Sequence, residues 1–328
     1  MVSSQRIVKS GPMETIDYEA FDGSGADGRA AAIRSHDPRN DDPVVVGSCD
    51  GLVCFKVRGG FLLYNPTTGE SRNVPISDLD LTGEGKFFHG FGYDPAFDEY
   101  KIVHVYYVED PGMWWVAIFS LRSGSWRRMM VQLDIHPGGF NTNYPPIYSG
   151  LGFGWHKSRQ GICWNGALHW CLELRELSNI DLYDSKPVIV SFNLSEENFH
   201  REIPVPNLDA MMRISIVGLG IHGANLLMYV GTPHFFMAWI MKENGIGGSW
   251  EELYKVSTGG IYILTWQQIP IVYTRREKIV FELGSSEMIL FNPQHGNVEG
   301  YPIRVNGGSA IYIETLVSPY LGCEPSRI

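Results

Sequence analysis

The sequence predicts an all-β protein, and three observations support this prediction. From residue 44 onward, short runs rich in Val, Ile, Tyr, Phe and Trp are cut at close intervals by turn residues, as in a sandwich or a barrel-like fold. The 328 residues include 37 glycines and 19 prolines. Together these two residue types exceed their usual combined share of roughly 12% in proteins, which implies many turns. Amphipathic helical patterns are absent, since the best candidate, residues 249–256, is too short for more than a turn or two.

The N-terminal residues differ in texture from the rest of the chain. Residues 14–21 form one possible strand. The stretch FDGSGADGRAAAIRSHDPRNDD (21–42) is rich in Gly, Asp and Arg without a sustained period, so we expect a mobile loop there. We therefore divide the chain into an N-terminal segment (1–43), a folded β domain (44–319) and a C-terminal tail (320–328).

Three similar segments in the folded part each predict a tight hairpin. They are GSCDGLVCF (47–55), GICWNGALHWC (161–171) and GLGIHGANLLMYV (218–230). Each holds a polar residue followed by glycine before an apolar strand, and such pairs favour the positive φ angles of two-residue hairpin turns. The predicted central pairs are Asp50-Gly51, Asn165-Gly166 and His222-Gly223. Further turns are expected at Asp98-Glu99 and at either Arg276-Glu277 or Glu277-Lys278.

A second pattern of strand, polar turn and strand follows these hairpins. It occurs at 62–74, 117–129, 190–203 and 289–301. Two hairpins in series make a four-stranded antiparallel unit, and radial repetition of such units makes a β-propeller. Five units are visible, and the strand 309–317 is expected to pair with the N-terminal strand and complete a sixth blade. The fold prediction is therefore a closed, six-bladed β-propeller.

One motif favours a different fold when it is taken alone. Gly218-x-Gly220-x-x-Gly223 has the glycine spacing of a dinucleotide-binding turn, and Glu243 lies about where the ribose-binding acid would follow. That fold needs parallel strands joined by a crossover helix, and Gly231 and Pro233 leave little room for one. We expect the glycines to serve hairpins instead.

Several longer motifs resemble one known family. In chain order they are GSCDGLVCF…LLYNPTTGESRNVP, GFGYDPAFDEYKIVHV, VAIFSLRSGSWR, MAWIMKENGIGGSWEELYKV and IYIETLVSP. Together they resemble the F-box-associated domain of plant F-box proteins, which include the pollen S-locus proteins, over roughly residues 44–319. The resemblance implies a kelch-like β-propeller that captures a protein target. In that family an F-box helix bundle precedes the propeller and binds the Skp-type adaptor of a cullin-based ubiquitin ligase.

Residues 1–43 depart from the family pattern, because they show none of the Leu- and Arg-rich helical sequence of an F-box. We therefore expect this polypeptide to bind the Skp-type adaptor only if an F-box is supplied upstream. The expected function is non-catalytic recognition of a protein, in the service of ubiquitin-dependent degradation. The alternative is a kelch-like propeller with enzymatic or carbohydrate-binding activity.

Charge and composition limit the other classes of function. The formal net charge is −10 and no run of basic residues stands out, which argues against nucleic-acid binding. The N-terminus lacks the apolar core of a signal peptide, and no apolar stretch is long enough to span a membrane. The five cysteines are odd in number and lack zinc-site spacing. We expect a cytoplasmic or nuclear location, or both.

The sequence holds no Gly-x-Ser-x-Gly elbow, His-Glu-x-x-His motif or P-loop, and we expect no enzyme activity, cofactor or metal. Cys163, His169 and Cys171 are close enough in sequence to suggest a metal, but their apolar, strand-like run favours buried packing. The acidic pairs Glu196-Glu197 and Glu251-Glu252 are expected on a solvated face.

Aromatic residues provide the candidate partner-binding positions. Trp126 and Trp250 follow equivalent Gly-Ser pairs, which suggests packing between blades. Adjacent strand residues point to opposite faces, so one of Trp114 and Trp115 is expected to be exposed. Long loops on a rigid scaffold often carry binding function, although their aromatics can also be tucked down. The candidate residues are Trp114, Trp115, Phe140, Tyr144, Tyr148, His234 and Phe235.

Overall fold

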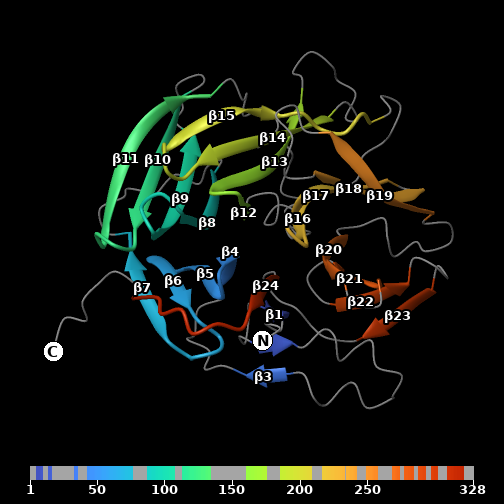
Figure 1. The fold of residues 1–328 in the computed structure, drawn as a ribbon, viewed down its shortest axis with the longest axis horizontal. Helices are drawn as coiled ribbons and strands as arrows, with labels where there is room; N and C mark the ends of the chain where they lie inside the picture. Colours follow the sequence, from blue (N-terminus) through green and yellow to red (C-terminus); the bar gives the residue numbers. More distant parts are fainter. Residues whose placement is uncertain are drawn as a thin grey trace.

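The computed structural model confirms the all-β prediction. It describes residues 5–9, 14–16, 33–35, 43–76, 87–107, 113–133, 160–175, 185–208, 216–232, 234–241, 249–257, 268–273, 277–283, 287–292, 297–301 and 309–320. Within these ranges every helix or strand assigned is a β-strand (Figure 1). In the same part of the chain there is no helix long and apolar enough to cross a membrane.

Most strands form units, by which we mean four consecutive strands joined as an antiparallel meander. The first unit contains β4 (Val44–Cys49), β5 (Leu52–Val57), β6 (Gly60–Tyr64) and β7 (Ser71–Pro75). The second contains β8 (Phe87–Asp94), β9 (Glu99–Tyr107), β10 (Met113–Ser120) and β11 (Ser125–Gln132). The third contains β12 (Gln160–Trp164), β13 (Ala167–Arg175), β14 (Ser185–Asn193) and β15 (Asn198–Ile203).

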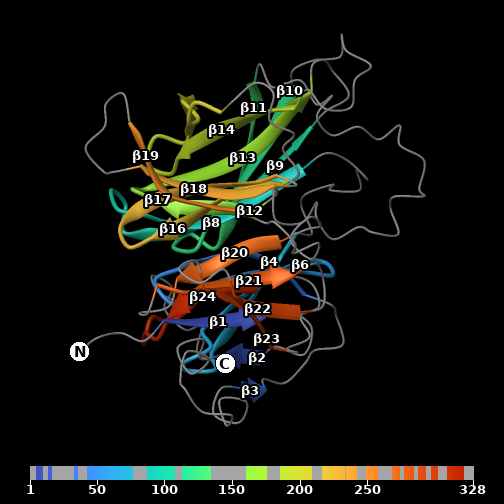
Figure 2. The ribbon, with the colours of Figure 1, turned by 90° about the vertical axis from the view of Figure 1, so that its right-hand side faces the viewer.

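Two further units follow in the C-terminal half. One contains β16 (Ile216–His222), β17 (Asn225–Gly231), β18 (Phe235–Met241) and β19 (Trp250–Ser257). The other contains β20 (Gln268–Tyr273), β21 (Ile279–Leu283), β22 (Glu287–Asn292) and β23 (Asn297–Tyr301). The units follow one another in chain order around a common centre (Figure 1). Figure 2 shows the same sheets from the side.

The last sheet joins the two ends of the chain. It contains β24 (Ser309–Ile313), β1 (Gln5–Lys9), β2 (Glu14–Ile16) and β3 (Ile33–Ser35), in that order. The C-terminal strand therefore pairs with an N-terminal strand, with Ile7 opposite Ile311. Its partner is β1, however, whereas the strand expected at 14–21 is the shorter β2, one position further out. β3 lies in the stretch that was expected to be a loop.

The second and third units are not separate sheets. β8 and β12 run parallel, with Gln160 opposite His89 and Gly161 opposite Gly90, which produces one eight-stranded sheet. A Cβ on Gly161 of β12 would lie 2.8 Å from the Trp170 indole, which donates a hydrogen bond to the His89 carbonyl of β8. Glycine therefore leaves room for this contact between the two units. Since two units share one sheet, the number of blades and their closure into a ring stay predictions.

Two of the predicted two-residue turns are confirmed. Asp50-Gly51 and Asn165-Gly166 have positive φ at both positions, as a type I′ turn requires. The prediction for His222-Gly223 is wrong by one residue. His222 pairs with Asn225, so the turn is Gly223-Ala224, with positive φ at the glycine alone. This is the type II′ pattern, in which only the first central residue needs glycine.

The turn predicted at Asp98-Glu99 is also displaced. Glu99 pairs with Asp94, and the loop is Pro95–Asp98, with Asp98 at a φ of 51°. The Asp94 carboxylate accepts hydrogen bonds from the amides of Ala96 (3.0 Å) and Phe97 (3.4 Å), which fixes the start of the loop. The connection from β20 to β21 includes Glu277, which has a φ of 61°. Tyr273 pairs with Ile279, so this connection is longer than the two-residue turn predicted at Arg276-Glu277 or Glu277-Lys278.

The unit β16–β19 excludes the dinucleotide fold. Its four strands are all antiparallel, and the segment around 249–256 is the strand β19. Gly218 lies opposite Tyr229 in the β16–β17 pair, and a side chain there would overlap the Tyr229 ring and hydroxyl. The glycine is therefore required by cross-strand packing, and no phosphate-binding turn exists at this position.

Tryptophans link successive units, as predicted for Trp126 and Trp250. The Trp126 indole donates to the Pro75 carbonyl of the first unit at 2.9 Å. The Trp250 indole donates to the carbonyl of Pro204, which follows β15 of the third unit. Trp164 likewise donates to Ala224 in the next unit, at 2.8 Å. His169 is buried and hydrogen-bonded to Ser191 (2.7 Å) and the Trp164 carbonyl (3.2 Å), so packing is its confirmed role.

Candidate functional site

The meander topology gives the molecule two distinct ends. The hairpin turns of neighbouring units contact one another at one end, which we call the turn face. A Cβ on Gly166 would lie 3.2 Å from Pro95, and the Trp164 indole binds Ala224. The opposite end, the connection face, is where β9 and β17 end and where β10 and β18 begin. The sequence-predicted binding residues in the described part of the chain all lie at or near the connection face.

Trp114 and Trp115 lie on opposite sides of β10. Trp114 is completely buried, with its ring centroid 5.6 Å from that of Phe88 in the core between the second and third units. Trp115 is half-buried and faces the other way. Trp114 is therefore a core residue, and Trp115 alone of the pair is open to a partner.

Trp115 is the centre of a row of large side chains across three strands. Its strand partners are Tyr106 of β9, which is half-buried, and Met130 of β11, which is 52% exposed. Directly opposed residues share a face of the sheet. The guanidinium of Arg128 lies 5.6 Å from the centroid of the Trp115 ring. Aromatic side chains, methionine and arginine are the residues that protein interfaces favour.

The β17–β18 connection holds the second pair of candidates. The amides of His234 (3.3 Å) and Phe235 (2.9 Å) both donate to the Thr232 hydroxyl, and the Thr232 amide donates to the Phe235 carbonyl (2.8 Å). These bonds fix a tight loop that leaves His234 exposed and Phe235 38% exposed. The Lys255 ammonium lies 4.7 Å from the Phe235 ring centroid.

The surroundings of Trp115 and Phe235 are arranged in the same way. Arg128 pairs with Ala117, two residues beyond Trp115, and Lys255 pairs with Met237, two residues beyond Phe235. In each unit a cation on the outer strand thus covers an aromatic ring near the start of the third strand. The sequence reasoning missed Tyr106, Arg128, Met130 and Lys255. Arg128 and Met130 are two residues apart on β11 and share a face of the strand, but the sequence did not show that this face is exposed.

The remaining candidates, Phe140, Tyr144 and Tyr148, lie outside the described residues. They fall between Leu133 and Gln160, the described residues that flank the connection from β11 to β12. Their part in binding stays a prediction.

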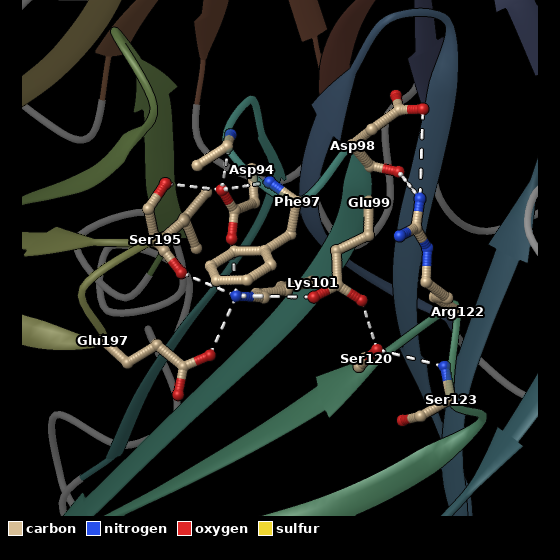
Figure 3. Close-up of polar contacts among 12 residues, drawn as sticks. Asp94, Phe97, Asp98, Glu99, Lys101, Ser120, Arg122, Ser123, Ser195 and Glu197 are labelled. Carbon is tan, nitrogen blue, oxygen red and sulfur yellow. Dashed lines mark hydrogen bonds and ion pairs between the residues drawn. The ribbon is translucent and has the colours of Figure 1, made fainter.

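The turn face holds a buried ionic cluster that the sequence did not predict (Figure 3). The Lys101 ammonium lies 2.6 Å from Asp94 Oδ2, 2.8 Å from Glu197 Oε1 and 3.5 Å from Glu99 Oε1. It also donates to the Leu194 carbonyl at 2.7 Å. Glu197 belongs to the acidic pair expected on a solvated face, but only Glu196 is largely exposed there.

Hydrogen bonds within the cluster favour the charged form of the Asp94 carboxyl. Burial raises the pKa of the Asp94 carboxyl, but hydrogen bonds from Lys101 and Ser195 outweigh that effect and hold the pKa below its usual value. Arg127 forms a second ion pair with Glu197. A lysine held by three carboxylates joins the second and third units and is not available to attack a substrate. Among the described residues, no group of three or more His, Cys, Asp or Glu could hold a metal ion.

Comparison with known proteins agrees with the family resemblance found in the sequence. A family profile described as the F-box associated beta propeller domain matches residues 32–239. An F-box/kelch-repeat protein of Arabidopsis thaliana is 28% identical over 282 residues, covering 84% of this chain and 69% of that protein. The F-box protein CPR1 of the same plant is 26% identical over 302 residues, covering 85% and 68%.

Proposed function

The chain belongs to the family of F-box associated β-propeller domains, and from this premise we propose that it is a non-catalytic module that captures a protein target at its connection face. Captured proteins are then ubiquitinated by a cullin-based ligase. The names of its Arabidopsis thaliana relatives, which are F-box proteins, support this role. In this role the protein works in the cytoplasm, the nucleus or both, without a cofactor.

The observation that carries the proposal is the pair of cation-covered aromatics. Trp115 and Phe235 are partly exposed, yet each is held by strand pairing and by a cation over its ring. A ring that is ordered before binding loses little conformational entropy in a complex. Partly exposed, ordered aromatics of this kind are typical anchors of protein interfaces.

We expect the Skp-type adaptor to bind an F-box and not the described β-strands. We expect the 328-residue polypeptide to give no complex with a Skp-type adaptor, and a fusion with an F-box upstream of Met1 to give one. Co-purification of adaptor and chain measures both.

Reconstituted ubiquitination tests the capture role. The F-box fusion, assembled with the adaptor and cullin, is expected to ubiquitinate a protein that it captures from plant extract. Replacement of both anchors, Trp115→Ala with Phe235→Ala, should abolish the product. Leu316→Ala is the matched control, because Leu316 is 84% exposed but follows β24 at the turn face. Equal loss in the control and the double variant would contradict the proposal.

A further inference from the structure

Two cysteines from different units lie close together, one on β4 and one on β12. Cys49 is the last residue of β4, and Cys163 lies in β12, 114 positions later in the chain. Their sulfur atoms are 3.9 Å apart and both residues are partly exposed. Cys54 and Cys171, by contrast, are buried. The two sulfurs are therefore close together, and neither residue is fully buried.

Close packing of β4, β8 and β12, the first strands of three units, brings the two residues together. The Gln160 side chain at the start of β12 donates to the Val45 carbonyl of β4. A Cβ on Gly47 would lie 3.4 Å from the Gly161 carbonyl oxygen, so β4 and β12 touch through glycine backbone. A Cβ on Gly92 of β8 would lie 2.7 Å from the Cys163 sulfur. The absent side chain on Gly92 thus leaves the space that the sulfur occupies.

The surroundings shift the pKa values of the two thiols in opposite directions. The Cys49 thiol is placed to donate to the Cys163 sulfur, and it also lies 3.6 Å from Asp50 Oδ2. The hydrogen bond from Cys49 lowers the pKa of Cys163 against the effect of burial, and a backbone hydrogen bond from Tyr93 adds to the lowering. The same hydrogen bond, followed by burial, raises the pKa of Cys49. Cys163 is thus the sulfur that ionises first, and the thiolate is the reactive form.

We propose that Cys49 and Cys163 are an oxidation site at which hydrogen peroxide closes an intramolecular disulfide between β4 and β12. In the part of the chain that the structure describes, no group of three or more His, Cys, Asp or Glu could hold a metal ion. Two sulfurs without a third ligating side chain therefore suit a disulfide better than a metal site. A disulfide needs sulfurs about 2.05 Å apart, so the side chains must move closer by rotation.

The chemistry is a two-electron oxidation with peroxide as the oxidant. The Cys163 thiolate attacks one peroxide oxygen, the O–O bond breaks, and a sulfenic acid and hydroxide result. The hydroxide takes the proton of the Cys49 thiol and becomes water. The Cys49 thiolate then attacks the Cys163 sulfur, the S–O bond breaks, and a second hydroxide leaves as the disulfide forms. The two sulfurs are oxidised and the two peroxide oxygens are reduced.

Mass spectrometry of the full chain tests the proposal. After removal of reductant and treatment with hydrogen peroxide, the intact chain should lose about 2 Da, the mass of two hydrogens. A digest without reductant should contain one linked peptide that joins Cys49 to Cys163. The loss should be absent from Cys49→Ser and Cys163→Ser and kept in the control Cys54→Ser.

A trapping reagent separates the two sulfurs. In Cys49→Ser, the sulfenic acid has no partner, so a 1,3-dione should label Cys163. In Cys163→Ser, labelling of Cys49 should be much weaker. A linked peptide through any other cysteine, or no linked peptide at all, would overturn the proposal. If a serine variant fails to fold, the wild-type digest decides alone by the same criterion.

Discussion

At the scale of single residues, Lys101 joins two units through buried ionic contacts. Its ammonium is buried with Asp94, which has a completely buried side chain, and with Glu197 of the neighbouring unit. Removing one partner of a buried ion pair leaves an uncompensated charge, which costs roughly 3–5 kcal/mol. We expect Lys101→Met to lower the free energy of unfolding by about that amount, measured by urea denaturation.

A surface lysine provides the control for this variant. Lys255→Met removes a cation that lies over the partly exposed Phe235 ring. Cation–π contacts at exposed sites contribute only about 0.5–1 kcal/mol. Equal losses for the two lysine variants would show that the Lys101 cluster is not a stabilising link.

His169 makes stability depend on pH. Burial lowers the pKa of His169 from 6.5 to about 4, although the hydrogen bond to the Trp164 carbonyl opposes the shift. The unfolded chain therefore binds a proton near pH 6.5 while the folded chain does not. The stabilisation is complete above pH 6.5 and is lost as the pH falls towards 4, by roughly 3 kcal/mol in all.

The variant His169→Gln isolates this contribution. Glutamine does not titrate, so we expect the free energy of unfolding to fall less steeply between pH 6.5 and 4 than in the wild type. Chemical denaturation at several pH values measures both slopes. Parallel curves for the variant and the wild type would exclude His169 as a source of the pH dependence.

The sequence alone could not predict contacts between residues of different units. Alternation along a strand predicted that one of Trp114 and Trp115 would be exposed, but the pattern is symmetric and did not say which. The choice depends on the third unit, whose Trp170 and Phe192 share a core with Trp114. The Lys101 cluster was hidden for the same reason, since Lys101 and Glu197 are 96 positions apart and meet only when two units pack.

At the scale of elements, Gly218 of β16 tests the meaning of the glycine motif. A side chain at Gly218 would overlap Tyr229, whereas a Cβ on Gly220 would lie at an ordinary 3.6 Å from Leu227. We expect Gly218→Ala to lower the midpoint of thermal unfolding by several degrees, because steric overlap in a packed sheet costs about 1–3 kcal/mol. Gly220→Ala should change it little. Equal effects would contradict the cross-strand explanation.

The strands themselves were largely predictable, whereas their exact turns were less so. Apolar runs and turn residues located the first hairpin of every unit and the last hairpin of four units, because period-two patterning and turn chemistry are local properties. The turn at Gly223-Ala224 was displaced by one residue, since a single glycine satisfies either register. β1 and β3 were missed because such short strands depend on pairing with β24 and β2.

At the scale of the whole molecule, β24 and the residues after it connect several elements. β24 pairs with β1, and the Asn65 side chain donates to the carbonyls of Thr315 (3.0 Å) and Val317 (2.8 Å). Arg72 also donates to the Pro319 carbonyl. We expect a chain that stops at residue 308 to lose cooperative thermal unfolding, followed by circular dichroism. Leu316→Ala, which keeps these contacts, should unfold as the wild type does. A cooperative transition in the shortened chain would argue against a joining role.

We propose that the connection face, and not the turn face, captures a protein target. The most direct test of this proposal places a photo-crosslinking amino acid at position 115, 235 or 316 of the full chain and exposes each form to plant extract. We expect positions 115 and 235 to crosslink to the same protein, and position 316 to crosslink to none. Crosslinking of that protein from position 316 alone would contradict the account.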